Sequence, residues 1–255
     1  MYIERHGTGE RRFLGLHGWS GDHTTFDPLL PFMPPDASLF AADLPGCGRS
    51  PEPAEWRLAR VAEEIAATIR RLAEPSLTLV GNCSGGLVGL YAVRLLAEAD
   101  EDHKVDRIVL IDPFAYWPWY FKVFASPAIG RYAYATAFAN PLGRRIVNAA
   151  LAKKRKDETD LTEGFDAVSP SVTLAHLRIL REIGGPEQFA AVRAPVHIVH
   201  GERTFTAVRR SIGIFRRIWP HLTVTELGGA GHVPLREAPA QAAAIIFGGE
   251  RCRTT

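Results

Sequence analysis

Cysteine is scarce in this chain, with 3 among 255 residues. A small, odd number of cysteines does not build a disulfide framework, so we expect free thiols in a reducing compartment. Charge of one sign is also lacking, because 30 basic residues face 28 acidic ones and leave a formal net charge of +2. This balance argues against a protein that binds nucleic acid or a membrane surface.

Long hydrophobic runs are absent as well: none reaches the roughly 18 residues that a membrane-spanning helix needs. The first residues, Met1 to His6, lack the basic-then-apolar order of a secretory signal. Hydrophobic residues make up 46% of the sequence, which is ordinary for a globular protein. The length suits one large domain or one domain with an insertion. We therefore expect a cytoplasmic globular protein with neither a membrane nor a nucleic-acid partner.

The chain alternates short apolar runs with longer helix-patterned stretches. Nearly continuous apolarity is typical of strands buried on both faces of a parallel sheet. The expected strands are Phe13–Leu16, Leu39–Leu44, Leu77–Val80, Arg107–Ile111, Val196–Val199 and Leu222–Leu227. The expected helices are Arg57–Leu72, Gly85–Glu98, Ala207–Ile218 and Arg236–Phe247. This order predicts an α/β fold with a doubly wound, mostly parallel sheet.

One stretch interrupts the alternation, since no strand candidate occurs from Pro113 to about Gly185. We interpret residues 113–185 as a helical cap inserted into a core formed by residues 1–112 and 186–255. The cap begins with many aromatic residues, some of which we expect to line an apolar pocket. The pocket candidates are Trp117, Trp119, Tyr120 and Phe124. The basic run Lys153–Lys156 is interpreted as a solvated helix end.

The strongest chemical motif is the segment Gly81-Asn82-Cys83-Ser84-Gly85-Gly86. It follows an expected strand and opens an expected helix, with glycines two residues before and after a central residue. This is the pattern of a nucleophile elbow, in which a reactive side chain occupies a sharp strand-to-helix turn. The central residue is Cys83, and a helix N-terminus favours the thiolate form of a cysteine.

Four motifs in order resemble those of the α/β-hydrolase fold family with a helical cap. They are Leu16-His17-Gly18-Trp19, Asp43-Leu44-Pro45-Gly46-Cys47-Gly48-Arg49-Ser50, the elbow at Cys83, and Gly228-Gly229-Ala230-Gly231-His232. The resemblance implies that Cys83 attacks a carbonyl group and that His232 acts as base and then as acid. It also implies an oxyanion hole made by the backbone N–H groups of Trp19 and Ser84, with His17 supporting the loop.

The acid of the expected triad departs from the family pattern. The usual Gly-x-x-Asp after the next-to-last strand is here Gly201-Glu202-Arg203-Thr204, and threonine supplies no charge. Two alternatives stay open. In haloalkane dehalogenases the acid follows the strand after the elbow, a position occupied here by Asp112; otherwise the site is a Cys/His dyad. Glu202 is a poorer candidate because it lies off the expected position.

The resemblance implies an acyl-transfer enzyme that acts through a thioester on Cys83, either an esterase- or thioesterase-type hydrolase or an acyltransferase. The expected substrate is a small molecule with an apolar acyl group, a carrier-bound thioester being one option, and neither a cofactor nor a metal is implied. Cysteine at the elbow resembles dienelactone hydrolases. Two other hypotheses are a non-catalytic ligand-binding protein on this scaffold and a lyase or cyclase with His232 as proton shuttle. Cys47 and Cys252 are interpreted as a turn residue and a tail residue.

Overall fold

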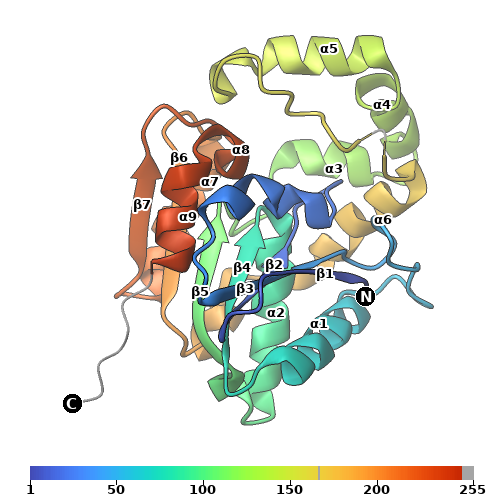
Figure 1. The fold of residues 1–255 in the computed structure, drawn as a ribbon. Coiled ribbons are helices and arrows are strands. Elements are labelled where there is room, and N and C mark those ends of the chain that lie inside the picture. Colours follow the sequence, from blue (N-terminus) through green and yellow to red (C-terminus); the bar gives the residue numbers. More distant parts are fainter. Residues whose placement is uncertain (166, 249–255) are drawn as a thin grey trace.

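The computed structural model describes residues 1–165 and 167–248, so Cys252 lies outside the described residues. Its centre is a seven-stranded sheet with the strand order β1-β3-β2-β4-β5-β6-β7 (Figure 1). The strands are β1 (Ile3–His6), β2 (Arg11–Leu16), β3 (Ala37–Ala42), β4 (Leu77–Asn82), β5 (Val105–Ile111), β6 (Val196–Gly201) and β7 (Thr223–Leu227). β1 pairs antiparallel with β3, and the other described pairings are parallel. The mostly parallel sheet expected from the sequence is confirmed.

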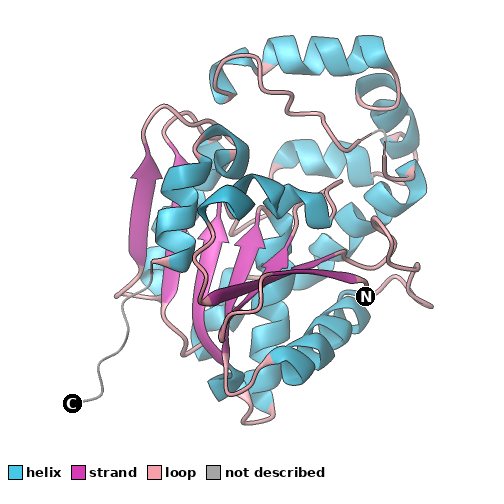
Figure 2. Cartoon of the chain, viewed as in Figure 1, coloured by secondary structure: helices cyan, strands magenta, loops and turns pink. Residues whose placement is uncertain are grey.

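Helices cover both faces of this sheet (Figure 2). Along the central strand β5, Ile108 and Leu110 join one apolar core, whereas Val109 and Ile111 join the other. Successive side chains of a strand point to opposite faces, so a strand buried on both faces is apolar throughout. The first core contains residues of α1 (Leu58–Leu72), α2 (Ser84–Glu98) and α7 (Thr206–Ile218), and the second those of η1 (His23–Phe32) and α9 (Pro239–Phe247).

Several strand ends differ from the prediction by one or two residues, and two larger differences concern whole elements. The edge strand β1 was not expected, because its sequence Ile-Glu-Arg-His carries charges and offers no apolar run. The helix expected over Arg236–Phe247 is broken into α8 (Pro234–Glu237) and α9 at Ala238. Pro239 is the reason, because proline lacks the N–H that a continuous helix would need at this position.

The segment between β5 and β6 is helical, and its first helices lie beyond the carboxyl ends of the parallel strands (Figure 1). We refer to residues 113–195 as the helical insertion. Its elements are α3 (Trp119–Ala125), α4 (Gly130–Ala137), α5 (Pro141–Ala150), η3 (Ala152–Lys154), α6 (Pro170–Ile179), η4 (Leu180–Ile183) and η5 (Pro186–Ala191); η2 (Asp102–Lys104) precedes β5. Tyr134, Phe138 and Phe165 form a small aromatic core inside it, against which Trp19 of the sheet domain packs.

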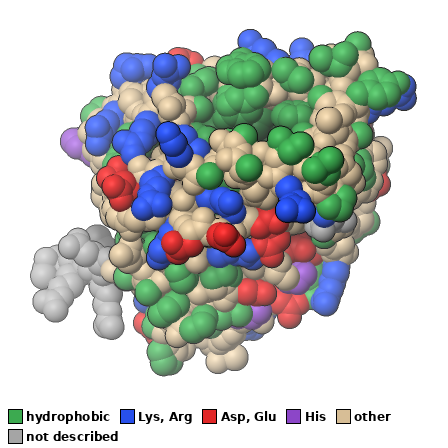
Figure 3. Space-filling view, turned by 90° about the horizontal axis from the view of Figure 1, so that it is seen from above, with side chains coloured by type: hydrophobic (Ala, Val, Ile, Leu, Met, Phe, Trp, Pro, Cys, Tyr) green, Lys and Arg blue, Asp and Glu red, His purple; other side chains and the backbone are tan. Residues whose placement is uncertain are grey.

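Hydrophobic side chains gather on the outer face of the insertion, interspersed with lysine and arginine (Figure 3). Trp119 and Leu142 are the most exposed large ones, at 73% and 68%. Among the described residues no helix has both the length and the apolarity to cross a membrane.

Candidate active site

Cys83 stands at the sharp turn between β4 and α2, as the sequence predicts. Its backbone angles, φ 50° and ψ −119°, are rare for a residue with a side chain, and its N–H donates to the Ile111 carbonyl over 2.8 Å. The flanking glycines permit this approach. A Cβ on Gly81 would lie 2.3 Å from Gly86 Cα, and one on Gly85 would lie 2.1 Å from the His17 carbonyl oxygen. The turn therefore requires glycine on both sides of Cys83.

The loop after β2 lies directly against this turn. A Cβ added to Gly18 would be 3.0 Å from Cys83 Cβ, so the peptide joining Gly18 to Trp19 borders the thiol. The Ser84 N–H belongs to the first turn of α2, where N–H groups have no acceptor within the helix. The N–H groups of Trp19 and Ser84 thus belong to the two chain segments that border Cys83.

His17 holds this loop in place rather than facing the cavity. Its buried ring contacts the Gly18 carbonyl through Nδ1 at 2.8 Å and accepts the Leu44 N–H through Nε2 at 2.9 Å. Nε2 therefore carries no proton, and Nδ1 is the donor. Burial lowers the pKa of His17, in keeping with a neutral ring. The supporting position agrees with the role that the family resemblance implied.

Asp112 follows β5 and contacts His232 although 120 residues separate them in sequence. Asp112 Oδ2 lies 2.7 Å from His232 Nδ1, and the carboxylate is fully buried. The backbone of Asp112 is left-handed, with φ 47°, and its N–H donates to the Val199 carbonyl over 2.9 Å. The adjacent strand β6 therefore fixes the turn that aims this carboxylate at the histidine.

Thr204, which stands where the family commonly has its acid, is a partner of Asp112. The Thr204 hydroxyl donates to Asp112 Oδ2 over 2.5 Å, and the Gly201 N–H donates to Oδ1 over 3.2 Å. Both donors stabilise the ionised carboxylate. Glu202 instead accepts the Gly229 N–H at 2.7 Å, so it braces the glycine turn before His232 and does not contact the histidine ring in the described structure.

The His232 ring is hydrogen-bonded on both sides, by Asp112 and by Cys83. Burial alone would lower its pKa, but the hydrogen bonds and negative charges of Asp112 and Cys83 outweigh burial and raise the pKa of His232 to about 10. Because Nδ1 faces Asp112, Nε2 is the nitrogen left for Cys83. The raised pKa favours the protonated His232 ring, in which Nε2 is a donor.

The helical insertion contributes to the position of His232. The His232 N–H donates to the Lys154 carbonyl over 2.9 Å, and Lys154 Nζ donates to the Thr204 carbonyl over 3.1 Å. The buried Glu237 carboxylate accepts the N–H groups of Gly231 and Lys156. The basic run Lys153–Lys156 is therefore not simply a solvated helix end: its backbone is docked on the histidine loop, a contact that charge patterning does not reveal.

Cys83 and His232 line a cavity with a volume of about 930 Å³. Most of its wall is apolar and comes from the helical insertion and the loops of the sheet domain. The aromatic lining residues are Trp19, Phe114, Trp119, Tyr120, Phe121, Phe124, Phe138, Phe165 and Phe205. Three of the four pocket candidates from the sequence, Trp119, Tyr120 and Phe124, are in this wall.

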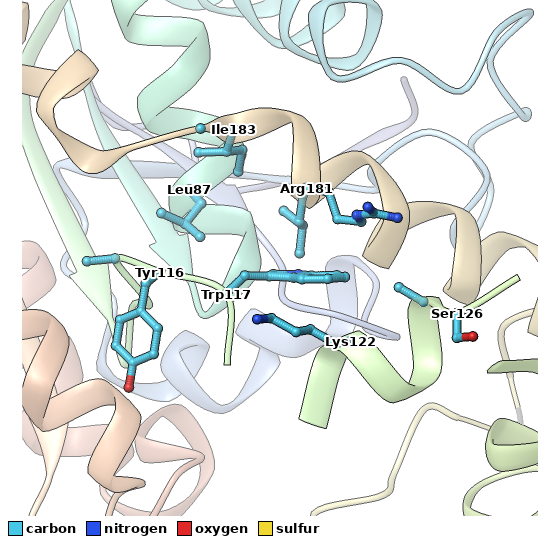
Figure 4. Close-up of a pocket in the computed structure, with 11 residues that line it drawn as sticks. Leu87, Tyr116, Trp117, Lys122, Ser126, Arg181 and Ile183 are labelled. Atoms are coloured by element: carbon cyan, nitrogen blue, oxygen red, sulfur yellow. The ribbon is translucent and has the colours of Figure 1, made fainter. Parts of the chain in front are cut away.

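The fourth candidate, Trp117, lines a different cavity of about 460 Å³ that shares no lining residue with the first. Trp117 precedes Pro118, the N-cap residue of α3, so it lies outside the helix that lines the first cavity. Its ring lies between the Lys122 and Arg181 side chains (Figure 4), with Arg181 Cζ 5.7 Å from the ring centroid.

One group of metal-type donors occurs among the described residues: Asp22, His23 and Asp43, with donor atoms within 4.8 Å of one another. The Asp43 carboxylate is engaged by the backbone N–H groups of His23 and Arg49 at 2.6 and 2.8 Å. This group therefore braces the turn after β3. Cys47 in the same turn is buried 3.5 Å from His176, and burial raises the pKa of its thiol to about 12.

Comparison with known proteins agrees with the fold. The sequence profile of the Alpha/beta hydrolase family matches residues 13–245. The chain belongs to this family. A pimeloyl-[acyl-carrier protein] methyl ester esterase of Neisseria meningitidis serogroup B is 35% identical over 119 residues, or 46% of this chain and 43% of the relative. The match thus spans less than half of that relative. One of the same name from Legionella pneumophila (strain Paris) is 22% identical over 237 residues, 92% of each chain.

Solved structures of other α/β hydrolases share the fold. A thermophilic esterase from Thermogutta terrifontis superposes with a TM-score of 0.75 at 18% identity, covering 96% of this chain and 90% of the other. The epoxide hydrolase VrEH1 from Vigna radiata superposes with a TM-score of 0.74 at 19% identity, covering 96% and 92%. Proteins of one fold catalyse different reactions, so the side chains of the site determine which reaction takes place.

Proposed function

We propose that this α/β hydrolase is an acyl-transfer enzyme of the esterase or thioesterase type, acting through a thioester on Cys83. The observation that carries the proposal is the 2.7 Å contact between Asp112 and His232, whose ring also hydrogen-bonds Cys83 in an aromatic cavity. Asp112 orients the ring and stabilises its protonated form. The helical insertion acts as the cap that closes the cavity.

In the proposed reaction His232 Nε2 holds the Cys83 proton, and the Cys83 sulfur attacks the carbonyl carbon of the substrate as a thiolate. The carbonyl electron pair moves onto oxygen, where the N–H groups of Trp19 and Ser84 stabilise the charge. Collapse of this intermediate expels the alcohol or thiol, which takes the proton from His232. Water or another acceptor then gives a proton to His232 and attacks the thioester, releasing the acyl group and the Cys83 sulfur.

The cavity supports an ester or thioester with an apolar acyl group as the substrate. Its volume of about 930 Å³ and its aromatic wall exclude water from a hydrocarbon or aromatic chain. The ion-paired Arg236 and Glu163 also line the cavity; both are exposed, so the polar part of the substrate faces them. The names of the curated relatives support an acyl methyl ester, including one attached to a carrier protein.

Steady-state hydrolysis of a panel of aryl esters and acyl thioesters tests the proposal. Wild type is compared with Cys83→Ala and His232→Ala, which should lose turnover, and with Cys47→Ala, which should keep it because Cys47 lies outside the cavity. Added alcohol or thiol acceptors separate transfer from hydrolysis by the products formed. Turnover by Cys83→Ala at the wild-type rate would overturn the proposal and favour proton-transfer chemistry at His232.

A further inference from the structure

The cavity that Trp117 lines is a second hollow next to the one that holds Cys83 and His232. Its wall comes from α2, α3, η4 and the segment between β5 and α3. Leu87 of α2 lines it one helical turn beyond Cys83. The Trp117 ring packs at 6.5 Å against Phe121, which lines the first cavity. The volume of about 460 Å³ is in the range of sites that bind small molecules.

The charged side chains that line this cavity are all basic within the described part of the chain. They are Lys122 and Arg181, and both are exposed. Neither forms a hydrogen bond or an ion pair with another described residue, although Arg181 lies over the Trp117 ring. The acid next to Arg181 in sequence, Glu182, pairs with Arg57 at 3.4 Å instead. Two positive charges without an acidic partner at one hollow attract an anion.

Trp117 adds a hydrogen-bond donor that has no acceptor. Its indole Nε1 is buried and unpartnered among residues 1–165 and 167–248. The ring lies between the side chains of Lys122 and Arg181, so the donor and both cations belong to one part of the wall (Figure 4). An unpaired buried donor destabilises the folded state, and an acceptor supplied by a ligand would relieve this. Much of the remaining wall is apolar and includes Leu180 and Ile183.

We propose that this second cavity binds a small organic oxyanion, namely a carboxylate or a phosphate carried on an apolar chain. The Arg181 guanidinium offers paired N–H donors that match either group, and the Lys122 ammonium adds a point charge. The Trp117 indole N–H donates to the same oxyanion, and the chain lies on the apolar part of the wall. The site is separate from the proposed acyl transfer, so it stands or falls independently of that reaction.

Isothermal titration calorimetry with three probes tests this site. Octanoate carries the carboxylate, octyl phosphate carries the phosphate, and 1-octanol has the same chain without a charge. At least one of the two anions should bind, and the one that binds more tightly identifies the preferred group. Arg181→Gln and Lys122→Gln should each weaken this binding about tenfold, and Trp117→Phe about threefold. Higher salt should weaken it further, because both cations are exposed.

Three further variants serve as controls, with circular dichroism as the check on folding. Arg178→Gln removes an exposed arginine that lines neither cavity, and Trp219→Phe removes another buried, unpartnered indole N–H outside both. Both should bind the anions as wild type does. Arg236→Gln alters the cavity of Cys83 and reports binding there.

Four results would overturn the inference: no binding of either anion, binding that Arg181→Gln leaves unchanged, equal weakening by Arg178→Gln, or binding of 1-octanol that depends equally on Arg181. Weakening by Arg236→Gln alone would place the anion in the cavity of Cys83 and would also overturn it. Lys122→Gln and Arg181→Gln change exposed side chains, so the test does not depend on whether Trp117→Phe folds.

Discussion

Replacing Asp112 by asparagine keeps the size of the side chain and removes its charge. The pKa of His232 is raised from 6.5 to about 10: burial opposes this rise, and the hydrogen bonds and charges of Asp112 and Cys83 cause it. At about 1.4 kcal/mol per pH unit, the rise corresponds to roughly 5 kcal/mol of preference for the imidazolium. Asp112 is the first of the groups that raise this pKa, so its loss should lower kcat/KM by about 10- to 100-fold.

The assay is steady-state hydrolysis of an aryl ester across pH, with circular dichroism as a check on folding. Thr204 offers an internal rescue, because its hydroxyl contacts the same Asp112 oxygen that faces His232, at 2.5 Å. Asp112→Asn combined with Thr204→Asp moves the carboxylate to the position more common in the family and should recover part of the lost activity. An Asp112→Asn enzyme as active as wild type, in a folded protein, would refute the reasoning.

Further predictions concern pH and packing. The pKa of His232 is raised above its unfolded value near 6.5, so its stabilising contribution is complete below about pH 6.5 and is lost as the pH rises through about 10. In urea titrations, the difference in unfolding free energy between wild type and His232→Gln should therefore shrink over that pH range. Gly85→Ala should abolish ester hydrolysis, because the added Cβ would collide with the backbone at His17. The Cβ of Gly213→Ala meets no atom within 4 Å, so this change should raise the free energy of unfolding by about 0.5–1 kcal/mol in the same titrations. Trp19→Ala loses a 2.8 Å hydrogen bond to the Thr173 carbonyl and four ring contacts, and should cost about 3 kcal/mol by urea denaturation.

The sheet was predictable from the sequence where burial decides the pattern. Strands β2 to β6 are marked by apolar runs because both faces of the sheet are covered there. The antiparallel edge strand Ile3–His6 was not predictable, because these residues form a strand through pairing with β3 rather than through an apolar composition. The elbow was predictable for a different reason, since the glycines around Cys83 are required by approaches of 2.1–2.3 Å.

The site was only partly predictable because its contacts join distant segments. The sequence offered Asp112 as one alternative beside a dyad, and it is the fold that brings this carboxylate within 2.7 Å of His232. No local signal indicated that Thr204 would donate to Asp112, or that the Lys154 backbone would hold the His232 loop. The first contact joins two loops at the ends of β5 and β6, and the second depends on how the helical insertion docks; composition encodes neither. The cavity that Trp117 lines was also not predictable, because it depends on α3 beginning only after Pro118.

The measurement that tests the central claim most directly is the mass of the intact protein after brief exposure to an activated ester, followed by peptide mapping. We expect one acyl group on the peptide that contains Cys83, absent in Cys83→Ala and retained longer in His232→Ala than in wild type. The adduct should be released by hydroxylamine, as a thioester is. An acyl group that maps to another residue, with turnover intact in Cys83→Ala, would contradict the account.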